Sequence, residues 1–571
     1  MEITLVVVVG IIAIVVVAAF SDTLGVAAPL SLAVVGIALS FVPGIPHPEV
    51  EPELILTVVL PPLLYSAAVN MPAVDFRRNL EPITGLAVLL VVVTTLGTGW
   101  LFHALLPDIG WPAAFALGAV ISPTDPIAAT AVGKKLGLPS RLLTMLEGEG
   151  LVNDATALVL LRSAVAALAA TVSLWHVLGD FLVAVVVAVI AGLLVGWLGV
   201  RARAMLDDSV AKTAVSFVIP FLAYLPAEEF HGSGVLAVVI AGLISGHLSP
   251  RHLSAQDRLV DATNWRTVAF LLESGIFLLM GLSLSGLIDD VRGEQLSAAQ
   301  AFGIGLLAAV VVMVIRAVFV APLVAFLRLD QRRAAEAKPR LDDINARMAD
   351  RTDLPQDSKR VRMITRRLGK MSAKIEFQLN ETVGARGGVV LAWSGMRGAV
   401  TVAAAQTLPA ETPMRSELVL IAFVVAVTTL LVQGLSLPTV IRVVRVPGDD
   451  PARLHDDAVE LMTLLSDAAE HVLDTPDLVD DHGNPYPPEL VGMVRDNTVR
   501  KGSAALRDLP ADGPDPREQY RQLRLQVLAA QRAELLRARD RETFGAKALG
   551  RVQHMLDLDE ALLQQLGRPG V

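Results

Sequence analysis

Acidic, amide and basic side chains stand inside segments of this chain that are otherwise apolar enough to cross a membrane. One stretch, EGEGLVNDATALVLLR, holds Glu149, Asn153 and Asp154. A second, ISPTDPIAAT, holds Asp125, and a third, WSGMRGAVTVAAAQ, holds Arg397. An Asp or Arg at mid-bilayer costs about 2.5–3.5 kcal/mol on insertion, so such residues usually line a pathway or pair with one another. The chemistry they indicate is the binding and passage of ions.

The surroundings of Asp125 favour a cation site. Two prolines flank it within four residues, which removes backbone donors, disrupts the helix and frees carbonyl groups. Transporters build cation sites from such broken helices, because unwound backbone at membrane depth must be buried in protein or line a cavity. The Thr124 hydroxyl and the Asp125 carboxylate add oxygen ligands that suit an alkali cation. The alternatives are that Asp125 caps a half-helix and that Thr124 satisfies nearby backbone.

The helix that carries the Asn–Asp pair presents its acids on two faces. At about 100° per residue, Glu147 and Asp154 share a face, whereas Glu149 lies about 140° from Asp154. Asp154 can therefore face an ion cavity while Glu149 reaches a neighbouring helix. Arg397 would need such a partner in a dry interior. Arg316, within another apolar span, is expected to pair with an acidic neighbour and to have no transport role.

Composition indicates that most of the chain is in lipid. Of its 571 residues, 53% are hydrophobic and only 18% are charged, against about a quarter charged in soluble proteins. A spanning helix needs roughly 20 mainly apolar residues. The sequence therefore predicts an all-α polytopic membrane protein with about thirteen spans. They are expected near 3–20, 26–43, 52–69, 82–106, 112–133, 141–171, 176–200, 209–224, 233–247, 266–288, 299–327, 388–408 and 416–440.

Basic residues occur in every second loop, which predicts the orientation. Because Lys and Arg favour the cytoplasmic side, and the number of spans is odd, we expect the N-terminus outside and the C-terminus in the cytoplasm of a cell whose plasma membrane holds the protein. The interrupted spans 112–133 and 388–408 lie seven spans apart and so cross in opposite directions. This arrangement is typical of an inverted repeat with a binding site where two broken helices meet.

Four regions are expected. Spans 1–11 occupy residues 1–327, a polar cytoplasmic insertion 328–387, the last two spans 388–445, and a cytoplasmic helical domain 446–571. The last region shows no phosphate loop or metal-ligand pattern, and its partner and role, packing or regulation, stay open. The chain has no cysteine, which excludes disulfides and thiolate metal sites. Its net charge of −9 gives no reason to expect a nucleic-acid partner.

Four motifs, in chain order, resemble those of one transporter family. They are LPPLLYSAAVNMPAVDFRRN at 60–79, SPTDP, EGEGLVNDATALV and SGMRGAV. Together they are similar to the bacterial sodium/proton exchangers, monovalent cation:proton antiporters of the Asn–Asp type. The resemblance covers about residues 1–445 and implies two crossed broken helices, inverted repeats and a homodimer.

The resemblance also implies roles for single residues. Asp154 would bind the cation or the proton, with Asp125 and Thr124 as neighbours that complete the site for the transported alkali cation. Asn153 would stand where electrogenic relatives carry a second aspartate, which suggests electroneutral exchange.

Two further roles follow from the same likeness. Glu149 and Arg397 would form a structural ion pair, and Glu273 would lie at the ion entrance. The chain departs from many relatives at Ser66, where they carry a glutamate, and at Gly150, where they carry a serine. These departures affect the expected ion selectivity more than the expected transport.

The function predicted from the sequence is antiport of Na⁺ or K⁺ against H⁺ by alternating access of a buried aspartate, with no enzymatic activity and no resident cofactor. The alternatives are a K⁺-selective K⁺/H⁺ antiporter, an uncoupled cation channel, and a sensor whose output is the C-terminal domain. An intramembrane aspartyl protease is disfavoured because its Gly-x-Gly-Asp signature is absent.

Overall fold

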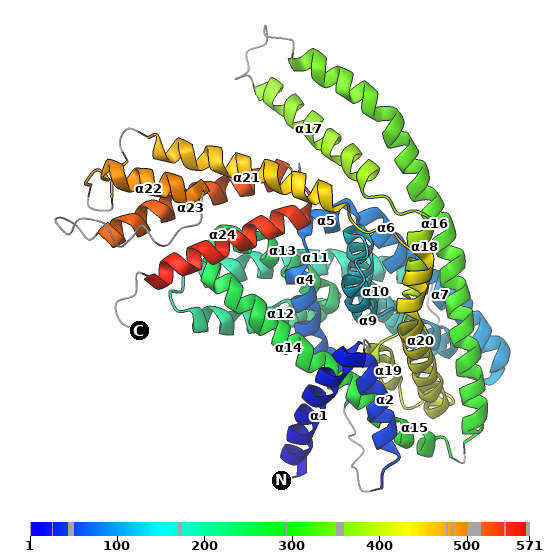
Figure 1. Cartoon of the computed structure of the whole chain (residues 1–571). Helices are drawn as coiled ribbons and strands as arrows, with labels where there is room; N and C mark the ends of the chain where they lie inside the picture. The colour runs from blue at the N-terminus through cyan, green and yellow to red at the C-terminus, as the bar shows by residue number, and fades with distance from the viewer. Residues whose placement is uncertain are drawn as a thin grey trace. The chain divides into compact units, whose positions relative to one another are not determined.

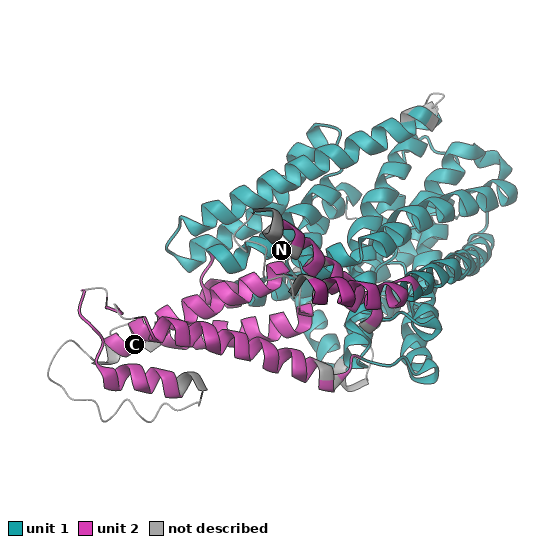
Figure 2. Ribbon diagram, turned by 90° about the horizontal axis from the view of Figure 1, so that it is seen from above, with its two compact units in different colours: residues 1–252, 261–332, 381–448 teal, residues 253–260, 333–380, 449–571 magenta. Residues whose placement is uncertain are grey.

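Every regular element in the described part of the chain is a helix. The computed structural model describes residues 2–24, 27–43, 51–169, 174–292, 294–349, 359–475, 478–480, 483–499, 516–541 and 544–566 (Figure 1). The chain divides into two compact units, coloured separately in Figure 2. Unit 1 comprises Met1–His252, Asp261–Arg332 and Glu381–Gly448, and unit 2 comprises Leu253–Val260, Arg333–Asn380 and Asp449–Val571.

Within the described residues, nine helices are long and apolar enough to cross a membrane. They span Pro52–Asn70, Leu80–Leu105, Ser140–Leu168, Val177–Ala204, Ser209–Glu229, Gly234–His252, Ala255–Asp290, Ala298–Ile344 and Arg415–Val444. Shorter apolar helices occupy Gly10–Ser21, Ala28–Ser40 and Pro107–Ile121. This confirms a polytopic, all-α membrane protein.

The first part of the chain forms helices α1 to α15, with two π-helical turns and one 3₁₀ turn between them. They are α1 (Glu2–Leu24), α2 (Ala28–Ser40), α3 (Pro52–Leu54), η1 (Ile55–Val59), α4 (Leu60–Asn70), α5 (Ala73–Arg78), α6 (Leu80–Thr84), η2 (Gly85–Leu89), α7 (Leu90–Leu105), η3 (Pro107–Ile109), α8 (Gly110–Ile121), α9 (Ile127–Lys135), α10 (Ser140–Ala169), α11 (Leu174–Ala204), α12 (Ser209–Glu229), α13 (Gly234–His252), α14 (Ala255–Leu282) and α15 (Leu284–Asp290).

The remaining helices complete both units. They are α16 (Ala298–Ala349), α17 (Lys359–Asn380), α18 (Ala385–Trp393), α19 (Ala399–Gln406), α20 (Arg415–Val444), α21 (Pro451–Leu473), α22 (Pro488–Val499), α23 (Pro516–Arg541) and α24 (Ala546–Leu566).

Two of the predicted spans are interrupted, as their prolines and glycines indicated. Span 112–133 consists of the half-helices α8 and α9, and span 388–408 of α18 and α19. The two breaks meet, because the Asp125 N–H donates a hydrogen bond of 2.7 Å to the carbonyl of Met396. The fold therefore brings two stretches of unwound backbone together inside unit 1.

The polar segment after the eleventh span is largely helical. The long green helix α16 (Figure 1) continues past residue 327, where the sequence placed its end, as far as Ala349. Its last turns pack against α17 through a small apolar cluster that includes Ala334, Leu341 and Ile375. Residues 350–358 of the expected insertion 328–387 lie outside the described residues.

The C-terminal helices α21 to α24 have apolar cores of their own. One cluster joins α21, α23 and α24 through side chains such as Leu461, Leu535 and Leu556. A second joins α21, α22 and α23 through residues that include Leu490 and Val527. The helical spacing of apolar residues in this region is thus used to pack the helices against each other.

Helix α13 approaches α4 closely at a glycine. A Cβ added at Gly246 would meet the backbone of Val69, including its carbonyl oxygen, which has no freedom to move aside. Around this contact lies an apolar core of unit 1, built from α4 and α10 to α14 and including Tyr65 and Val238. Glycine at 246 is therefore required by packing.

We expect Gly246→Ala to lower the stability of the folded protein by about 1–3 kcal/mol, because the added methyl overpacks the contact between α4 and α13. Gly303→Ala on α16 is the matched control, since nothing lies within 4 Å of its added Cβ. Thermal unfolding in detergent measures both. Equal unfolding midpoints for the two variants would contradict the close approach.

Candidate functional site

A cavity of 660 Å³ in unit 1 collects most of the candidate residues. Its walls come from α4, the break between α8 and α9, α10, α14, and the break between α18 and α19. Thr124, Asp125, Asp154 and Glu273 all line it. Residues from five regions of the sequence thus face one space, as a shared ion site requires.

Asp154 is available to a ligand. It is half-buried, lines the cavity and forms no hydrogen bond or ion pair with any residue that the structure describes. Glu147 lines the same cavity, whereas Glu149 is buried and does not. The helical spacing therefore correctly separated the two faces of α10.

A short hydrogen-bonded chain holds the loop between α8 and α9. The Thr124 hydroxyl donates to Glu149 Oε1 at 2.7 Å. The Asn153 amide donates to the Thr124 carbonyl at 2.8 Å and to its hydroxyl oxygen at 2.9 Å. Asn153 is fully buried and does not line the cavity, and its Oδ1 has no hydrogen-bond partner among the described residues. Asn153 thus orients Thr124, which does line the cavity.

The structure corrects the predicted ion pair of Glu149 with Arg397. Glu149 pairs with Arg316, whose Nη1 and Nη2 lie 2.5 Å and 2.8 Å from the two carboxylate oxygens. The side chains are only 1% and 3% exposed. Arg316 also donates to the carbonyl of Leu391 at 3.1 Å, so this pair ties α10, α16 and α18 together. Arg316 does have the acidic neighbour expected for it.

Arg397 binds backbone instead of a carboxylate. Its guanidinium donates to the carbonyls of Ile121 at 3.0 Å, of Ser122 at 3.3 Å, and of Gly395. Its own N–H donates to the Thr429 hydroxyl at 3.1 Å. These carbonyls lie at or just beyond the ends of the first half-helices, where helical partners are missing. Arg397 replaces those partners in both broken spans.

Asp125 has two roles in the geometry. Its Oδ1 accepts a hydrogen bond of 2.9 Å from the Ile127 N–H and so caps α9, which is the capping alternative weighed from the sequence. It also lines the cavity. A Cβ at Gly398 would collide with this carboxylate, and one at Gly150 would collide with the ring of Pro126. The glycine at 150, a departure from many relatives, therefore fits the proline beside it.

Other charged residues besides Asp125 and Asp154 also line the cavity. Lys134 and Glu147 form an ion pair of 2.7 Å, and Arg266 lines the cavity two turns from Glu273 along α14. Ser66 also lines it and donates a hydrogen bond of 3.3 Å to the carbonyl of Trp265. The Ser66 hydroxyl therefore joins α4 to α14.

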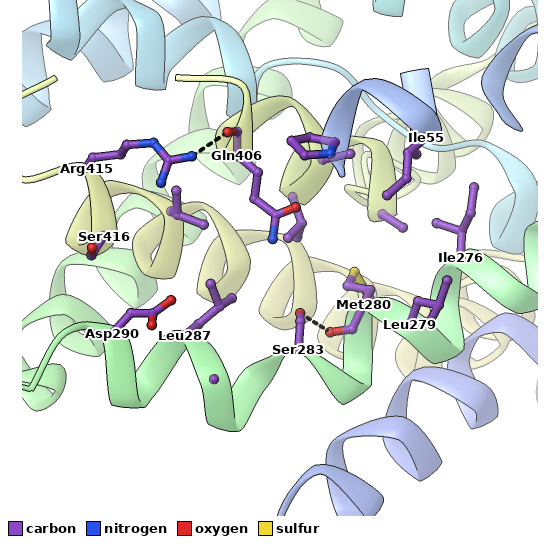
Figure 3. Close-up of a pocket in the computed structure, with 16 residues that line it drawn as sticks. Ile55, Ile276, Leu279, Met280, Ser283, Leu287, Asp290, Gln406, Arg415 and Ser416 are labelled. Atoms are coloured by element: carbon purple, nitrogen blue, oxygen red, sulfur yellow. Dashed lines mark hydrogen bonds between the residues drawn. The ribbon is translucent and has the colours of Figure 1, made fainter. Parts of the chain in front are cut away.

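A second cavity, of 390 Å³, lies further along α14 and α15. Figure 3 shows Ile276, Ser283 and Asp290 on this side, facing Gln406 and Arg415 across the space. Arg415 donates to the carbonyls of Gln406 at 2.6 Å and Leu408 at 2.7 Å, which closes the end of α19.

The two cavities meet α14 within one turn of each other. The first is lined by α14 as far as Glu273 and the second from Ile276 onward. That interval is about 4.5 Å of helix. On α19 the linings alternate, with Thr401 facing the first cavity and Val402 the second. Only about one turn of α14 therefore separates two cavities that lie along different halves of the span Ala255–Asp290.

A family model for the transmembrane part of sodium/hydrogen exchangers matches residues 9–443. The chain belongs to the sodium/hydrogen exchanger family. An uncharacterised Na⁺/H⁺ exchanger of Mycobacterium tuberculosis is 30% identical over 548 residues, which cover 94% of this chain and 91% of that protein. The low-affinity Na⁺/H⁺ antiporter NhaS1 of Synechocystis is 28% identical over 523 residues, 89% of this chain and 87% of its own. The family resemblance of the four motifs is confirmed.

The fold of this exchanger is also similar to a solved structure. The sodium proton antiporter MjNhaP1 from Methanocaldococcus jannaschii, solved at pH 8, matches with a TM-score of 0.55 and 18% sequence identity. The match covers 77% of this chain and 98% of that one. The two proteins share the helical architecture of the membrane part.

Sequence reasoning missed two features of the exchanger's site. It gave Arg316 no named partner, although an arginine in the middle of an apolar span needs one as much as Arg397 does. It also did not assign Arg266 or Lys134 to the cavity. The signal for Arg266 was its spacing of seven residues from Glu273, which places both on one helical face.

Replacing Arg316 by Gln should destabilise the exchanger by about 3–5 kcal/mol, because Glu149 would be left buried without its charge partner. Arg162→Gln serves as the control, since the side chains of the Arg162–Glu228 pair are 54% and 24% exposed and exposed pairs contribute about 1 kcal/mol or less. The yield of monodisperse protein and its unfolding midpoint report both changes. If Arg316→Gln were as stable as Arg162→Gln, the buried pair would have no structural importance.

Proposed function

We propose that this exchanger is a secondary active antiporter that moves Na⁺, or K⁺, against H⁺ across the plasma membrane. The observation that carries the proposal is the Asp154 carboxylate, which lines a cavity and has no partner among the described residues. Such a group can hold a proton or, once ionised, a cation. Because one carboxylate serves both ligands, binding of one excludes the other.

The cation is proposed to bind at the inner end of the cavity of 660 Å³. Asp154, Asp125 and Thr124 supply oxygen atoms that line it, and the break between α8 and α9 adds unwound backbone. Asn153 contributes by holding Thr124 in place. Glu273 increases the negative charge of the same cavity and would attract a cation towards it. No resident cofactor takes part.

Coupling requires that Asp154 be reached from each side of the membrane in turn. The two cavities support this proposal, since they approach each other within one turn of α14. A rigid-body movement of one helix bundle against another would close the first cavity and extend the second towards the site. If the site moves only when it carries a proton or a cation, the two gradients are coupled.

The exchange is proposed to be electroneutral, with one proton for one cation. Asn153 cannot ionise, so the Asn–Asp pair carries a single titratable group. The basic residues Lys134 and Arg266 lie on the first cavity, which favours a cytoplasmic opening for it. A cytoplasmic C-terminus and a homodimer complete the proposal, and a K⁺-selective K⁺/H⁺ antiporter is the alternative that the same site allows.

Asp154→Asn should reduce cation-dependent proton flux to the level of empty vesicles, because an amide neither takes up a proton nor neutralises a cation. The measurement uses purified protein in proteoliposomes that contain a pH-sensitive dye, titrated separately with Na⁺, K⁺ and Li⁺. Asp108→Asn, an exposed residue outside both cavities, should behave as the unaltered protein. Normal exchange by folded Asp154→Asn would refute the mechanism, and flux with K⁺ alone would favour the alternative.

A Na⁺ concentration jump should drive proton flux without net current if the exchange is one for one. To test for net charge movement, the current is recorded from the same vesicles on a solid support, and the dye signal is measured in parallel. A current that scales with the amount of protein and with proton flux would contradict electroneutrality while leaving antiport intact. An uncoupled channel would give current that does not depend on a proton gradient.

A further inference from the structure

The beginning of helix α14 belongs structurally to the C-terminal region. Residues Leu253–Val260 form a compact unit with the C-terminal helices and not with the membrane-spanning helices on either side of them in the sequence. Helix α14 nevertheless continues without a break from Ala255 to Leu282. Its first turns therefore lie in unit 2, and its remaining turns lie in unit 1.

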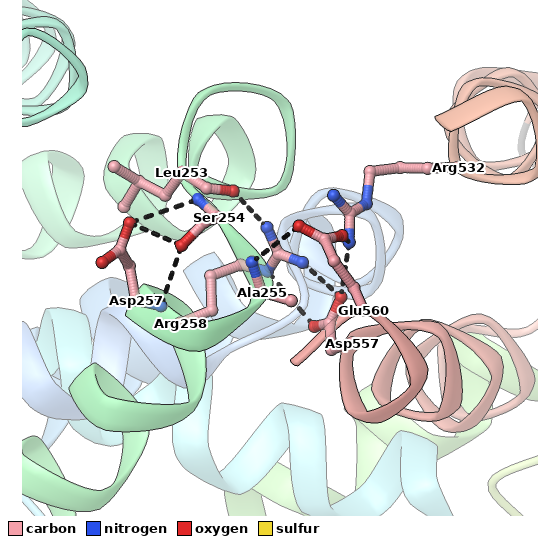
Figure 4. Close-up of polar contacts among 8 residues, drawn as sticks. All are labelled: Leu253, Ser254, Ala255, Asp257, Arg258, Arg532, Asp557 and Glu560. Atoms are coloured by element: carbon pink, nitrogen blue, oxygen red, sulfur yellow. Dashed lines mark hydrogen bonds and ion pairs between the residues drawn. The ribbon is translucent and has the colours of Figure 1, made fainter. Parts of the chain in front are cut away.

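Within unit 2, a buried, charge-assisted cluster joins the first turns of α14 to α23 and α24 (Figure 4). Arg258 of α14 donates to both carboxylate oxygens of Asp557 on α24, through Nη2 and through Nε at 3.2 Å. Arg532 of α23 also donates to Asp557, at 3.1 Å, and pairs with Glu560. Asp557 is 5% exposed and Glu560 is 8% exposed. Bidentate arginine–carboxylate pairs of this kind fix orientation as well as distance.

The N-terminal end of α14 is held at its backbone too. Ser254 and Asp257 cap it reciprocally, with the Ser254 hydroxyl donating to Asp257 at 2.7 Å and the Asp257 N–H donating to the Ser254 hydroxyl oxygen at 3.2 Å. Glu560 accepts a bond of 3.5 Å from the Ala255 N–H. A carboxylate at this position interacts favourably with the helix dipole. Two acids of α24 therefore fix both a side chain and the first turn of α14.

The same helix leads directly to the candidate ion site. Along it, Ala262, Arg266, Ala269, Phe270 and Glu273 line the first cavity at helical spacing. Arg258 lies fifteen residues before Glu273, about 22 Å along a helix. A helix transmits a shift or rotation of its first turn to the residues further along it, because its backbone hydrogen bonds keep it rigid.

We propose that Arg258 is a positioning residue for transport: by binding Asp557 it lets the C-terminal helices set the placement of α14 and hence of Glu273 in the ion cavity. The inference rests on the proposed function and adds a means of regulating it. A factor that changes the packing of α24 would alter cation affinity without touching the cavity.

The test is a double-mutant cycle in the full-length protein, with Arg258→Gln, Asp557→Asn and the two combined. In proteoliposomes, Arg258→Gln should raise the apparent KM for Na⁺ by at least about fivefold, with little change in the maximal rate per folded protein. The double variant should be no worse than the more impaired single variant, because the changes remove one shared interaction. An unchanged KM, or effects that simply multiply, would overturn the proposal.

Arg524→Gln is the matched control, since Arg524 of α23 pairs with a different acid of α24, Asp559. It should leave KM unaltered, and a change equal to that of Arg258→Gln would show a general disturbance of the C-terminal helices and overturn the proposal. Hydrogen exchange at residues 255–265 gives a readout independent of transport. It should rise in Arg258→Gln and in Asp557→Asn but not in Arg524→Gln. If the unaltered protein failed to exchange ions while this protection pattern held, the proposed function would be refuted. The Arg258–Asp557 contact would still be shown to hold the first turns of α14.

Discussion

The fold of the exchanger's centre depends on satisfying the backbone groups that two broken helices expose away from water. Each unpaired peptide group in such an interior costs several kcal/mol. The structure answers this in two ways. The breaks bond to each other through the Asp125 N–H and the Met396 carbonyl. Arg397 supplies donors to carbonyls of both first half-helices. Without these bonds the unwound segments that border the cavity would carry unsatisfied backbone groups and would not be stable.

The two buried arginines, Arg397 and Arg316, have different kinds of partner. The guanidinium of Arg397 donates to neutral carbonyls. Glu149 pairs with the other buried arginine of this region, Arg316. The Glu149–Arg316 ion pair thus lies on one face of α10. On the other face Asp154 lines the cavity unpaired within the described residues. The separation of the Glu149–Arg316 pair from Asp154 follows from the helical spacing of α10 and the position of Arg316 on α16.

Much of this was accessible from sequence because the physical constraints are local. The need for about 20 apolar residues per span located the membrane helices, and the prolines around Asp125 located a break. The angle between positions 149 and 154 placed them on different faces. What failed was the choice of partner for Glu149. The angle shows which way a side chain leaves its own helix, but not which of two buried arginines on other helices stands there. Only the packing of α10 against α16 decides it.

The anchoring of α14 lay beyond sequence reasoning for a related reason. Arg258 and Asp557 are separated by 299 positions, and each is unremarkable in its own helix, where a charged residue is normally taken for a solvated one. The contact matters for the cavity because α14 is one continuous helix. Because α14 carries both Arg258 and Glu273, a bond made outside the membrane-spanning unit bears on the orientation of an acid inside it. The same rigidity that lets a helix hold an ion site in place therefore lets a distant domain adjust it.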